Sequence, residues 1–344
     1  MEYRLGRSQL KDDVVYGPRA PGIPHPIQRA DTPIMGLDDS PSADSLFDGR
    51  YELGAQIGSG GMSRVHAARD TRTGREIALK ILDVPDHQLR WAIERFVRGA
   101  RIATQVRHTN VVSILDHGAS PSGAVYIALE RLSGRDLGEL LAERRLSWRW
   151  TRHMMAEICA GMNAIHEAGF VHCDLKPNNC FFVETSARVE ILDFGLATVA
   201  ARRPPSALLL GTPAYMAPER IRGEALDRRA DVYAAGVMLY EMLTGERPFD
   251  GEQPTVVFDQ HLHTPPPTID VDATRFPTPP AVNEVIIRAL AKRRDDRFAD
   301  MDALWTALER LEPSTIATGR TRGISQPQSV SLAEAPTLRI HDQA

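Results

Sequence analysis

The sequence predicts an α+β protein in which a small β-rich lobe precedes a larger, mainly helical lobe. Residues 51–57 and 64–69 alternate between apolar and polar side chains, which is the period of a strand, and residues 76–82 form a third predicted strand. Beyond Gly134 the apolar residues recur instead at helical spacing, over 149–168, 230–243, 281–293 and 301–311. This change of period predicts where one lobe ends and the next begins.

Within the small lobe, the first two strands flank three glycines, Gly58, Gly60 and Gly61. They predict a hairpin with an unusually long glycine turn. A helix over 89–106 and two further strands, at 112–117 and 125–129, complete this lobe. We therefore expect a small antiparallel sheet with one main helix.

Two polar segments flank the lobes. Residues 1–48 are rich in proline and charge, and residues 313–344 are rich in Ser, Thr, Pro and Gly, so neither holds enough apolar surface to offset the entropy of ordering. We expect a disordered arm at 1–48, a small lobe with its hinge at 49–132, a large lobe at 133–312 and a flexible tail at 313–344.

Composition excludes several classes of protein. The net charge of −4, from 41 basic and 45 acidic residues, gives no cationic field for nucleic acid. The three cysteines, Cys159, Cys173 and Cys180, form no C-x-x-C pair, which argues against a disulfide framework or a thiolate metal site. No apolar run approaches the roughly 18 residues of a membrane span, and the N-terminus has no signal core. We expect a cytoplasmic protein.

The glycine cluster and the lysine that follows it favour a phosphate site. Glycines let backbone N–H groups approach phosphate oxygens, although a loose hairpin turn would use the same residues. A dinucleotide site would place a helix after the glycines, whereas here a strand follows, and the ordinary P-loop motif is absent. Lys80 closes the third strand, where its ammonium group can reach the α and β phosphates.

A second group of polar residues follows at 171–195. Asp174, Lys176 and Asn179 share one loop. Two short apolar stretches come next in the chain, and Asp193 follows them. Phosphoryl transfer needs such a set, since charge on the phosphoryl oxygens must be neutralised while the nucleophile is aligned. Asn179 and Asp193 offer the hard oxygen ligands that Mg²⁺ prefers. Asp174 can accept the hydroxyl proton, and Lys176 can balance the transferring group.

From about Tyr51 to Leu311 the chain resembles the eukaryotic-like (Hanks-type) bacterial Ser/Thr protein kinases. The motifs occur in family order: Gly58 and Gly60, Lys80, residues 174–179, Asp193-Phe194-Gly195, Ala217-Pro218-Glu219, Asp231, and Arg297 as the ion-pair partner of Glu219. The resemblance implies a bilobal protein-kinase-like fold. It also implies transfer of the γ-phosphoryl group of Mg-ATP to Ser/Thr hydroxyls of protein substrates. These substrates would include the chain itself, which would then be a phosphoprotein that acts in signalling.

The same resemblance implies where the nucleotide binds. Adenine would contact backbone groups of the hinge at Glu130 and Leu132. The implied nucleotide-binding residues are Ile57, Gly58, Gly60, Val65, Ala78, Lys80, Glu130 and Leu132. The implied catalytic residues are Asp174, Lys176 and Lys80, and the implied metal ligands are Asn179 and Asp193.

One departure from the family puts catalysis in question. Gly99 stands where the family has a helix glutamate that pairs with the strand lysine. Glu94 cannot replace it, because five residues at about 100° each turn it roughly 140° around the helix. Glycine also costs about 1 kcal/mol in a helix interior. Either another carboxylate or water orients Lys80 and activity is reduced, or the protein is a weakly active or inactive pseudokinase that acts as a nucleotide-binding scaffold.

Three further features lead to smaller expectations. Cys173 replaces the arginine that in the family pairs with a phosphorylated activation segment, so activity should depend little on phosphorylation of Ser206 or Thr212. His261 and His263 could contact a metal, but we expect a solvated loop there. Thr337 in the tail is a hypothetical site for a phosphothreonine-binding partner.

Overall fold

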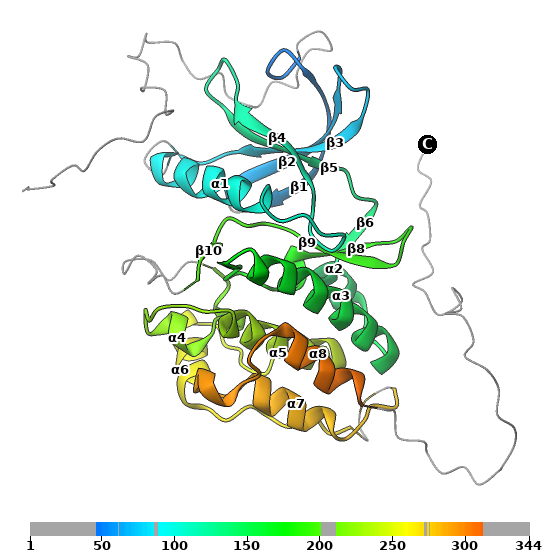
Figure 1. Ribbon diagram of the computed structural model, residues 1–344, viewed down its shortest axis with the longest axis vertical. Helices are drawn as coiled ribbons and strands as arrows, with labels where there is room; N and C mark the ends of the chain where they lie inside the picture. The colour runs from blue at the N-terminus through cyan, green and yellow to red at the C-terminus, as the bar shows by residue number, and fades with distance from the viewer. Residues whose placement is uncertain are drawn as a thin grey trace, which may run out of the picture. The chain divides into compact units, whose positions relative to one another are not determined.

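The computed structural model describes residues 46–311, except 61, 86–88, 201–210, 272–273 and 275. Residues 1–45 of the predicted arm and the predicted tail 313–344 lie outside the described residues. The described part is an α+β protein in which a sheet lobe is followed by a mainly helical lobe (Figure 1), which confirms the fold class.

A five-stranded antiparallel sheet forms the small lobe, with strand order β1-β2-β3-β5-β4. Its strands are β1 (Tyr51–Gly60), β2 (Ser63–Asp70), β3 (Glu76–Leu82), β4 (Ile114–Ala119) and β5 (Val125–Glu130). Successive side chains of a strand point to opposite faces. Ile77, Leu79 and Ile81 of β3 therefore join one apolar cluster, and Leu82 joins another.

The hairpin between β1 and β2 differs from the prediction. The prediction of a long glycine turn is wrong, because the two strands remain paired up to Gly60 and Ser63. Gly58 lies opposite Val65 in the same ladder, after a shift of register that begins at Gln56. Gly58 and Gly60 are thus held at the edge of the sheet, paired with a β2 strand that itself pairs with β3.

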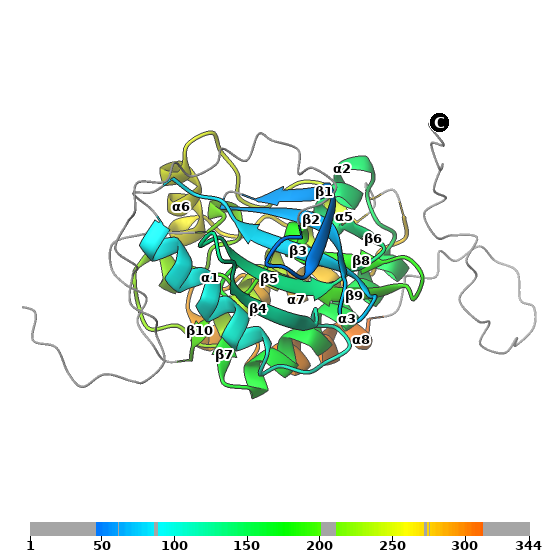
Figure 2. The ribbon, with the colours of Figure 1, turned by 90° about the horizontal axis from the view of Figure 1, so that it is seen from above.

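The main helix of this lobe is α1 (Leu89–Ala103), which ends three residues before its predicted end. Ala92, Phe96 and Ala100 pack on Val125 and Ile127 of the central sheet. Figure 2 shows α1 running along the sheet beside β4, which it contacts. The apolar face of α1 is therefore fixed by the sheet, and its other faces are available for the large lobe.

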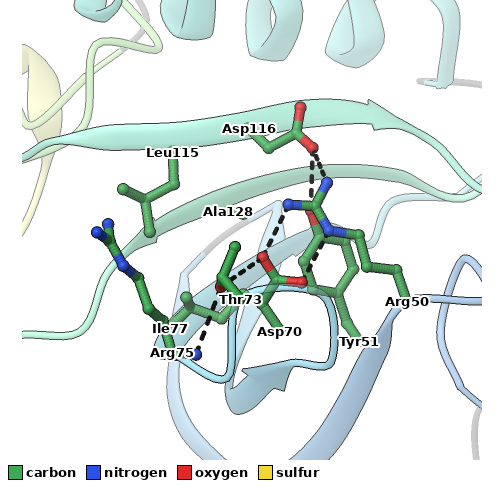
Figure 3. A pocket seen from close by; sticks show the side chains of 9 residues that line it. All are labelled: Arg50, Tyr51, Asp70, Thr73, Arg75, Ile77, Leu115, Asp116 and Ala128. Atoms are coloured by element: carbon green, nitrogen blue, oxygen red, sulfur yellow. Dashed lines mark hydrogen bonds and ion pairs between the residues drawn. The ribbon is translucent and has the colours of Figure 1, made fainter.

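An ionic network on the sheet lobe ties three strands together (Figure 3). Arg50 donates through Nε and Nη2 to both carboxylate oxygens of Asp70, at 2.9 and 2.8 Å, and its Nη1 pairs with Asp116. Tyr51 donates to the same Asp116 at 3.1 Å. These groups line a cavity of about 140 Å³, and the fork from Arg50 holds the pKa of Asp70 well below its usual range.

The large lobe is built from helices around α5. Its helices are α2 (Leu137–Glu143), α3 (Trp148–Glu167), α4 (Pro218–Ile221), α5 (Arg229–Thr244), α6 (Pro254–His263), α7 (Val282–Ala289) and α8 (Met301–Glu309). Short strands and turns connect them: β6 (Gly134–Asp136), β7 (Phe170–Val171), β8 (Cys180–Val183), β9 (Arg188–Ile191), β10 (Thr198–Val199), η2 (Pro177–Asn179), η3 (Pro213–Tyr215) and η4 (Arg294–Asp296). Most of α5 is buried, as expected of a helix that others surround.

The predicted helices of this lobe are found with small differences at their ends. The exception is α7, which ends at Ala289, four residues before the predicted end, because Leu290 caps it and the η4 turn follows. Three helices, α2, α4 and α6, were not predicted from the sequence. Among the described residues, no helix combines the length and the apolar character that crossing a bilayer demands.

A buried ion pair joins α4 to the segment before α8. Both guanidinium Nη atoms of Arg297 donate to Glu219 at 2.8 Å, and its Nε donates to the Ala291 carbonyl at 2.7 Å. The two charged side chains are 0% and 3% exposed. Each charge therefore depends on the other, because neither can be hydrated.

We expect Glu219→Ala to lower the free energy of unfolding by about 3–5 kcal/mol, because it leaves the Arg297 cation buried without its counter-ion. Urea denaturation of the purified chain measures this change. The exposed Arg293–Asp296 pair, at 3.8 Å, offers a matched control, and Asp296→Ala should change stability by less than about 1 kcal/mol. Equal effects of the two substitutions would contradict the structural role of the buried pair.

Candidate active site

The loop after β7 is held by one carboxylate of α5. Asp231, which is buried, accepts the backbone N–H groups of His172 and Cys173 at 2.8 and 2.9 Å. It also lies 2.8 Å from Nε2 of His166. Burial alone would raise the pKa of Asp231, but the hydrogen bond from His166 and the two N–H groups lower it below its usual range. The charged carboxylate thus fixes the backbone just before Asp174.

This anchoring sustains an unfavourable backbone conformation. Cys173 has φ of +66°, a left-handed conformation that non-glycine residues rarely adopt. Such strain persists only where the surroundings hold the residue in place, and it concentrates at functional sites. Here Asp231 supplies the hold, since it accepts the N–H of the strained residue itself.

The next residues of the loop form a compact polar group. Nδ2 of Asn179 donates to Oδ2 of Asp174 at 3.0 Å and to its carbonyl at 2.7 Å. The ammonium of Lys176 lies 3.2 Å from the same Oδ2 and donates to Oγ1 of Thr212 at 2.8 Å. Because Nδ2 of Asn179 faces the carboxylate of Asp174, the Oδ1 atom of Asn179 is the one that a cation can approach.

A second group joins the two lobes. Nζ of Lys80, on β3, lies 3.0 Å from Oδ2 of Asp193, and the Gly195 N–H donates to Oδ1 of Asp193 at 3.0 Å. The attraction of Lys80 holds the pKa of Asp193 well below its usual range, although burial opposes this shift. The side chain of Asp193 is 43% exposed, so an ionised carboxylate is open to a ligand.

The two groups are connected through the backbone. The Leu192 N–H donates to the carbonyl of Asn179 at 2.8 Å, and Nε2 of His172 lies 3.0 Å from the carbonyl of Leu192. Asp193 follows directly in the chain, with φ of +53°, a second left-handed non-glycine residue. The structure therefore brings together Lys80 and Asp193, and separately Asp174, Lys176 and Asn179, on segments that are hydrogen-bonded to each other.

Comparison with known proteins agrees with this geometry. A family model described as "Protein kinase domain" matches residues 51–306. The chain belongs to the protein kinase family. A probable serine/threonine-protein kinase of Corynebacterium efficiens is 35% identical over 300 residues, which cover 83% of this chain and 45% of that protein. The PknB kinases of Corynebacterium glutamicum and Mycolicibacterium smegmatis are 36% and 34% identical, over 78% and 83% of this chain and 43% and 47% of theirs.

The chain spans about half the length of these curated relatives. Together the matches confirm the predicted membership of the bacterial Ser/Thr branch. The kinase family uses ATP and a divalent metal, so the polar groups described above can be compared with that chemistry.

The nucleotide residues implied by the family lie on the sheet and the hinge. Ala78 is buried on β3, Val65 is partly buried on β2, and Ile57 is half exposed on β1. Gly58 and Gly60 lie beyond Ile57, in the paired part of the hairpin. These residues come from three adjacent strands of one sheet, with Val65 directly opposite Lys80 in the ladder.

At the hinge, the backbone N–H of Glu130 donates to the carbonyl of Ser113 at 3.0 Å. Any contact of Glu130 with adenine must therefore use its carbonyl oxygen. Leu132 borders an open hollow of about 380 Å³ together with Arg131 and Glu76, which form an ion pair at 2.8 Å. Ile57, Val65 and Ala78 do not line this hollow, so the adenine position stays a prediction.

Gly99 stands where the protein kinase family has its helix glutamate, so the partner of Lys80 must come from elsewhere. Glu94 pairs with Arg90 at 3.7 Å on the exposed side of α1, as its angular position predicts. The carboxylate that pairs with Lys80 is Asp193 instead. Gly99 is buried and faces the backbone of Phe194. Of the two alternatives for orienting Lys80, a carboxylate or water, the structure shows a carboxylate, that of Asp193.

Sequence reasoning missed two arginines near the kinase site. Nε of Arg95, on α1, donates to the carbonyl of Gly195 at 3.2 Å. Arg220, on α4, reaches the space beside Gly211, where a Cβ atom would lie 3.1 Å from its Nη2 and 3.2 Å from Oδ1 of Asp174. The spacing of Arg95, one helical turn before Gly99, is a signal that could have identified it.

The expected solvated loop at His261 is wrong. His261 lies in α6, fully buried, with Nδ1 2.8 Å from the Tyr233 hydroxyl and its ring against Phe249. His263 is exposed and pairs with Asp259. Among the described residues no group of three or more His, Cys, Asp or Glu side chains could hold a metal. His261 is therefore part of the packing of the large lobe.

Burial lowers the pKa of His261 to about 4, from 6.5, and nearby Lys292 adds to the shift. Between these values the unfolded chain binds a proton that the folded protein does not. This contribution to stability is complete above pH 6.5 and is lost as the pH falls towards 4, by up to about 3 kcal/mol. His261→Asn should flatten that part of the stability profile, as measured by urea denaturation at several pH values.

The exposed His263 provides the control for this measurement, because His263→Asn lies on the same helix and should leave the slope between pH 6.5 and 4 unchanged. A wild-type slope that survives in His261→Asn would show that other groups carry the pH dependence.

Proposed function

We propose that this chain is a Ser/Thr protein kinase that transfers the γ-phosphoryl group of Mg-ATP to hydroxyls of protein substrates, including its own. The observation that carries the proposal is the convergence of two ion-paired groups, Lys80 with Asp193 and Asp174 with Lys176, on segments joined by hydrogen bonds. Phosphoryl transfer depends on positioning and electrostatic stabilisation, which such a set supplies.

In this proposal the nucleotide binds under the sheet. The carbonyl of Glu130 and the backbone of Leu132 bind adenine, with Ile57, Val65 and Ala78 above it. The N–H groups of Gly58 and Gly60 approach the phosphates, and the ammonium of Lys80 binds the α and β phosphates. The position of Lys80 on β3, opposite Val65 in the sheet, supports this arrangement.

Asp193 and Asn179 would hold the metal, which we propose to be Mg²⁺. The fit is good, because Asp193 is ionised and partly exposed, and Oδ1 of Asn179 is turned away from Asp174. Mg²⁺ commonly binds through one or two carboxylates plus the phosphates of the substrate, so a larger protein cage is not required. When bound, the ion neutralises charge on the phosphate oxygens.

Asp174 is the proposed acceptor for the substrate hydroxyl proton. Its carboxylate is oriented by Nδ2 of Asn179 and lies beside the ammonium of Lys176, which can balance charge on the transferring group. The hydrogen bond from Lys176 to Thr212 ties this loop to the segment before α4, which in the family accommodates a polypeptide. This tie supports a Ser/Thr hydroxyl as the acceptor.

The remaining parts of the proposal depend on sequence features. A phosphothreonine-binding partner would recognise Thr337, which lies outside the described residues. A cytoplasmic location is supported by three free, buried cysteines, whose thiols match a reducing compartment. Low dependence on activation-segment phosphorylation is supported by Cys173, whose buried side chain offers no cation for a phosphate.

We expect Asp174→Asn to lower the rate of labelled-phosphate transfer from Mg-ATP to a generic protein acceptor by about 10²- to 10⁴-fold, because the proton acceptor is lost. The transfer assay should be run beside ATP-induced thermal shifts, which report nucleotide binding independently. The shift should remain in the variant.

Asp259→Asn provides a charge-matched control on an exposed residue of α6, and its transfer rate should equal that of the wild type. A nucleotide-induced shift without transfer in the wild type would replace the kinase proposal with the pseudokinase alternative. The absence of both would contradict the proposed nucleotide site as well.

A further inference from the structure

We propose that Gly99 and Arg95 form a clamp through which α1 directly holds the Phe194–Gly195 peptide, and so positions Asp193 for metal binding. The clamp is defined as the Gly99 contact with Phe194 together with the Arg95 hydrogen bond to Gly195. It would tie the helix directly to the loop of Asp193, whereas the glutamate of the family pairs with the strand lysine. The inference rests on the proposed role of Asp193 as a metal ligand.

The first part of the clamp is the close approach at Gly99. A Cβ atom built on Gly99 would lie 2.9 Å from the carbonyl oxygen of Phe194, 3.0 Å from its carbon and 3.2 Å from the Gly195 nitrogen. All three are backbone atoms, which cannot move aside as the end of a side chain can. Glycine is thus the residue that lets α1 touch this peptide, which explains a glycine in a helix interior.

The second part is the guanidinium of Arg95. Arg95 lies four residues before Gly99, and side chains at this spacing share one face of a helix. Its Nε donates to the Gly195 carbonyl at 3.2 Å, and its guanidinium lies 4.5 Å from the centre of the Trp91 ring. Stacking on Trp91 restricts the side chain, so the donor is aimed at the loop.

These contacts continue to the carboxylate of Asp193. Arg95 binds the carbonyl of Gly195, the N–H of the same Gly195 donates to Oδ1 of Asp193 at 3.0 Å, and Oδ2 of Asp193 pairs with Lys80 at 3.0 Å. Each hydrogen bond restricts the next group, and outer contacts of this type orient the ligands of metal sites. Arg95 is therefore a positioning residue that acts through Gly195.

The positive charge of Arg95 distinguishes the clamp from the glutamate of the family, which is an anion. Burial lowers the pKa of Arg95, and attraction from Asp193 and Asp174 opposes that shift. The guanidinium is a cation one helical turn before the position where the family has an anion. A glutamate at position 99 would meet the Phe194 carbonyl and would also compete for Lys80. Restoring the family residue should therefore damage this site.

The clamp is tested by the affinity for Mg²⁺ of the chain saturated with a non-hydrolysable ATP analogue, measured by calorimetric titration. Arg95→Gln should weaken this affinity about tenfold, the lower end for loss of an outer contact at a metal site. Arg98→Gln, three residues along the same helix and exposed, is the matched control and should stay within twofold. Arg95→Lys, which keeps the charge but not the fork, should give an intermediate affinity.

Gly99→Glu should weaken Mg²⁺ binding at least as much as Arg95→Gln and should not increase phosphate transfer. If thermal melting shows that Gly99→Glu does not fold, Gly99→Ala replaces it in the test, because its smaller side chain intrudes less on the Phe194 backbone. An unchanged Mg²⁺ affinity in Arg95→Gln, or faster transfer in Gly99→Glu, would overturn the clamp. Normal metal binding without transfer in the wild type would remove only the kinase proposal, whereas no metal binding in the wild type would overturn both.

Discussion

The buried carboxylate of Asp231 is the constraint on which the rest of the site depends. It lies in the first turn of α5, the helix that the large lobe surrounds, and it receives N–H groups from two consecutive residues of the loop that carries Asp174. A helix N-terminus favours a negative charge, and a buried charge must be fully hydrogen-bonded. The core therefore fixes this loop, including the strained Cys173, before any ligand is considered.

The small lobe contributes the other half of the site through few contacts. Lys80 reaches Asp193 from the sheet, and α1 reaches the following peptide through Gly99 and Arg95. All of these contacts end on the three residues 193–195. Because the sheet and α1 pack on each other through Phe96 and Ile127, the strand that carries Lys80 and the helix that contacts residues 194 and 195 belong to one packed lobe.

Motif spacing predicted the fold and indicated which polar side chains lie together, because within those segments the contacts are local. Asp174 and Asn179 lie on one loop, and the strand pattern placed Lys80 on the third strand, where it pairs with Val65 and Ile127. The rest depends on contacts between distant segments. The burial of His261 follows from its packing on Tyr233 and Phe249, and the reach of Arg95 follows from the approach of α1 to residue 195. No local pattern encodes these distances.

The absence of the family's helix glutamate at Gly99 is therefore a weak argument that the protein is catalytically inactive. In the family that residue holds the strand lysine, and here Asp193 holds it at 3.0 Å, while the loop backbone is contacted by α1 itself. At the position of Cys173 a cation is also lost, and Arg220 from α4 lies near Oδ1 of Asp174. In both places the charge expected from the motif is absent while an arginine lies close by, Arg95 of the same helix in one case and Arg220 of α4 in the other. Catalytic competence should thus be judged from how Asp174 and Asp193 are held, because those two carboxylates would contact the reacting groups.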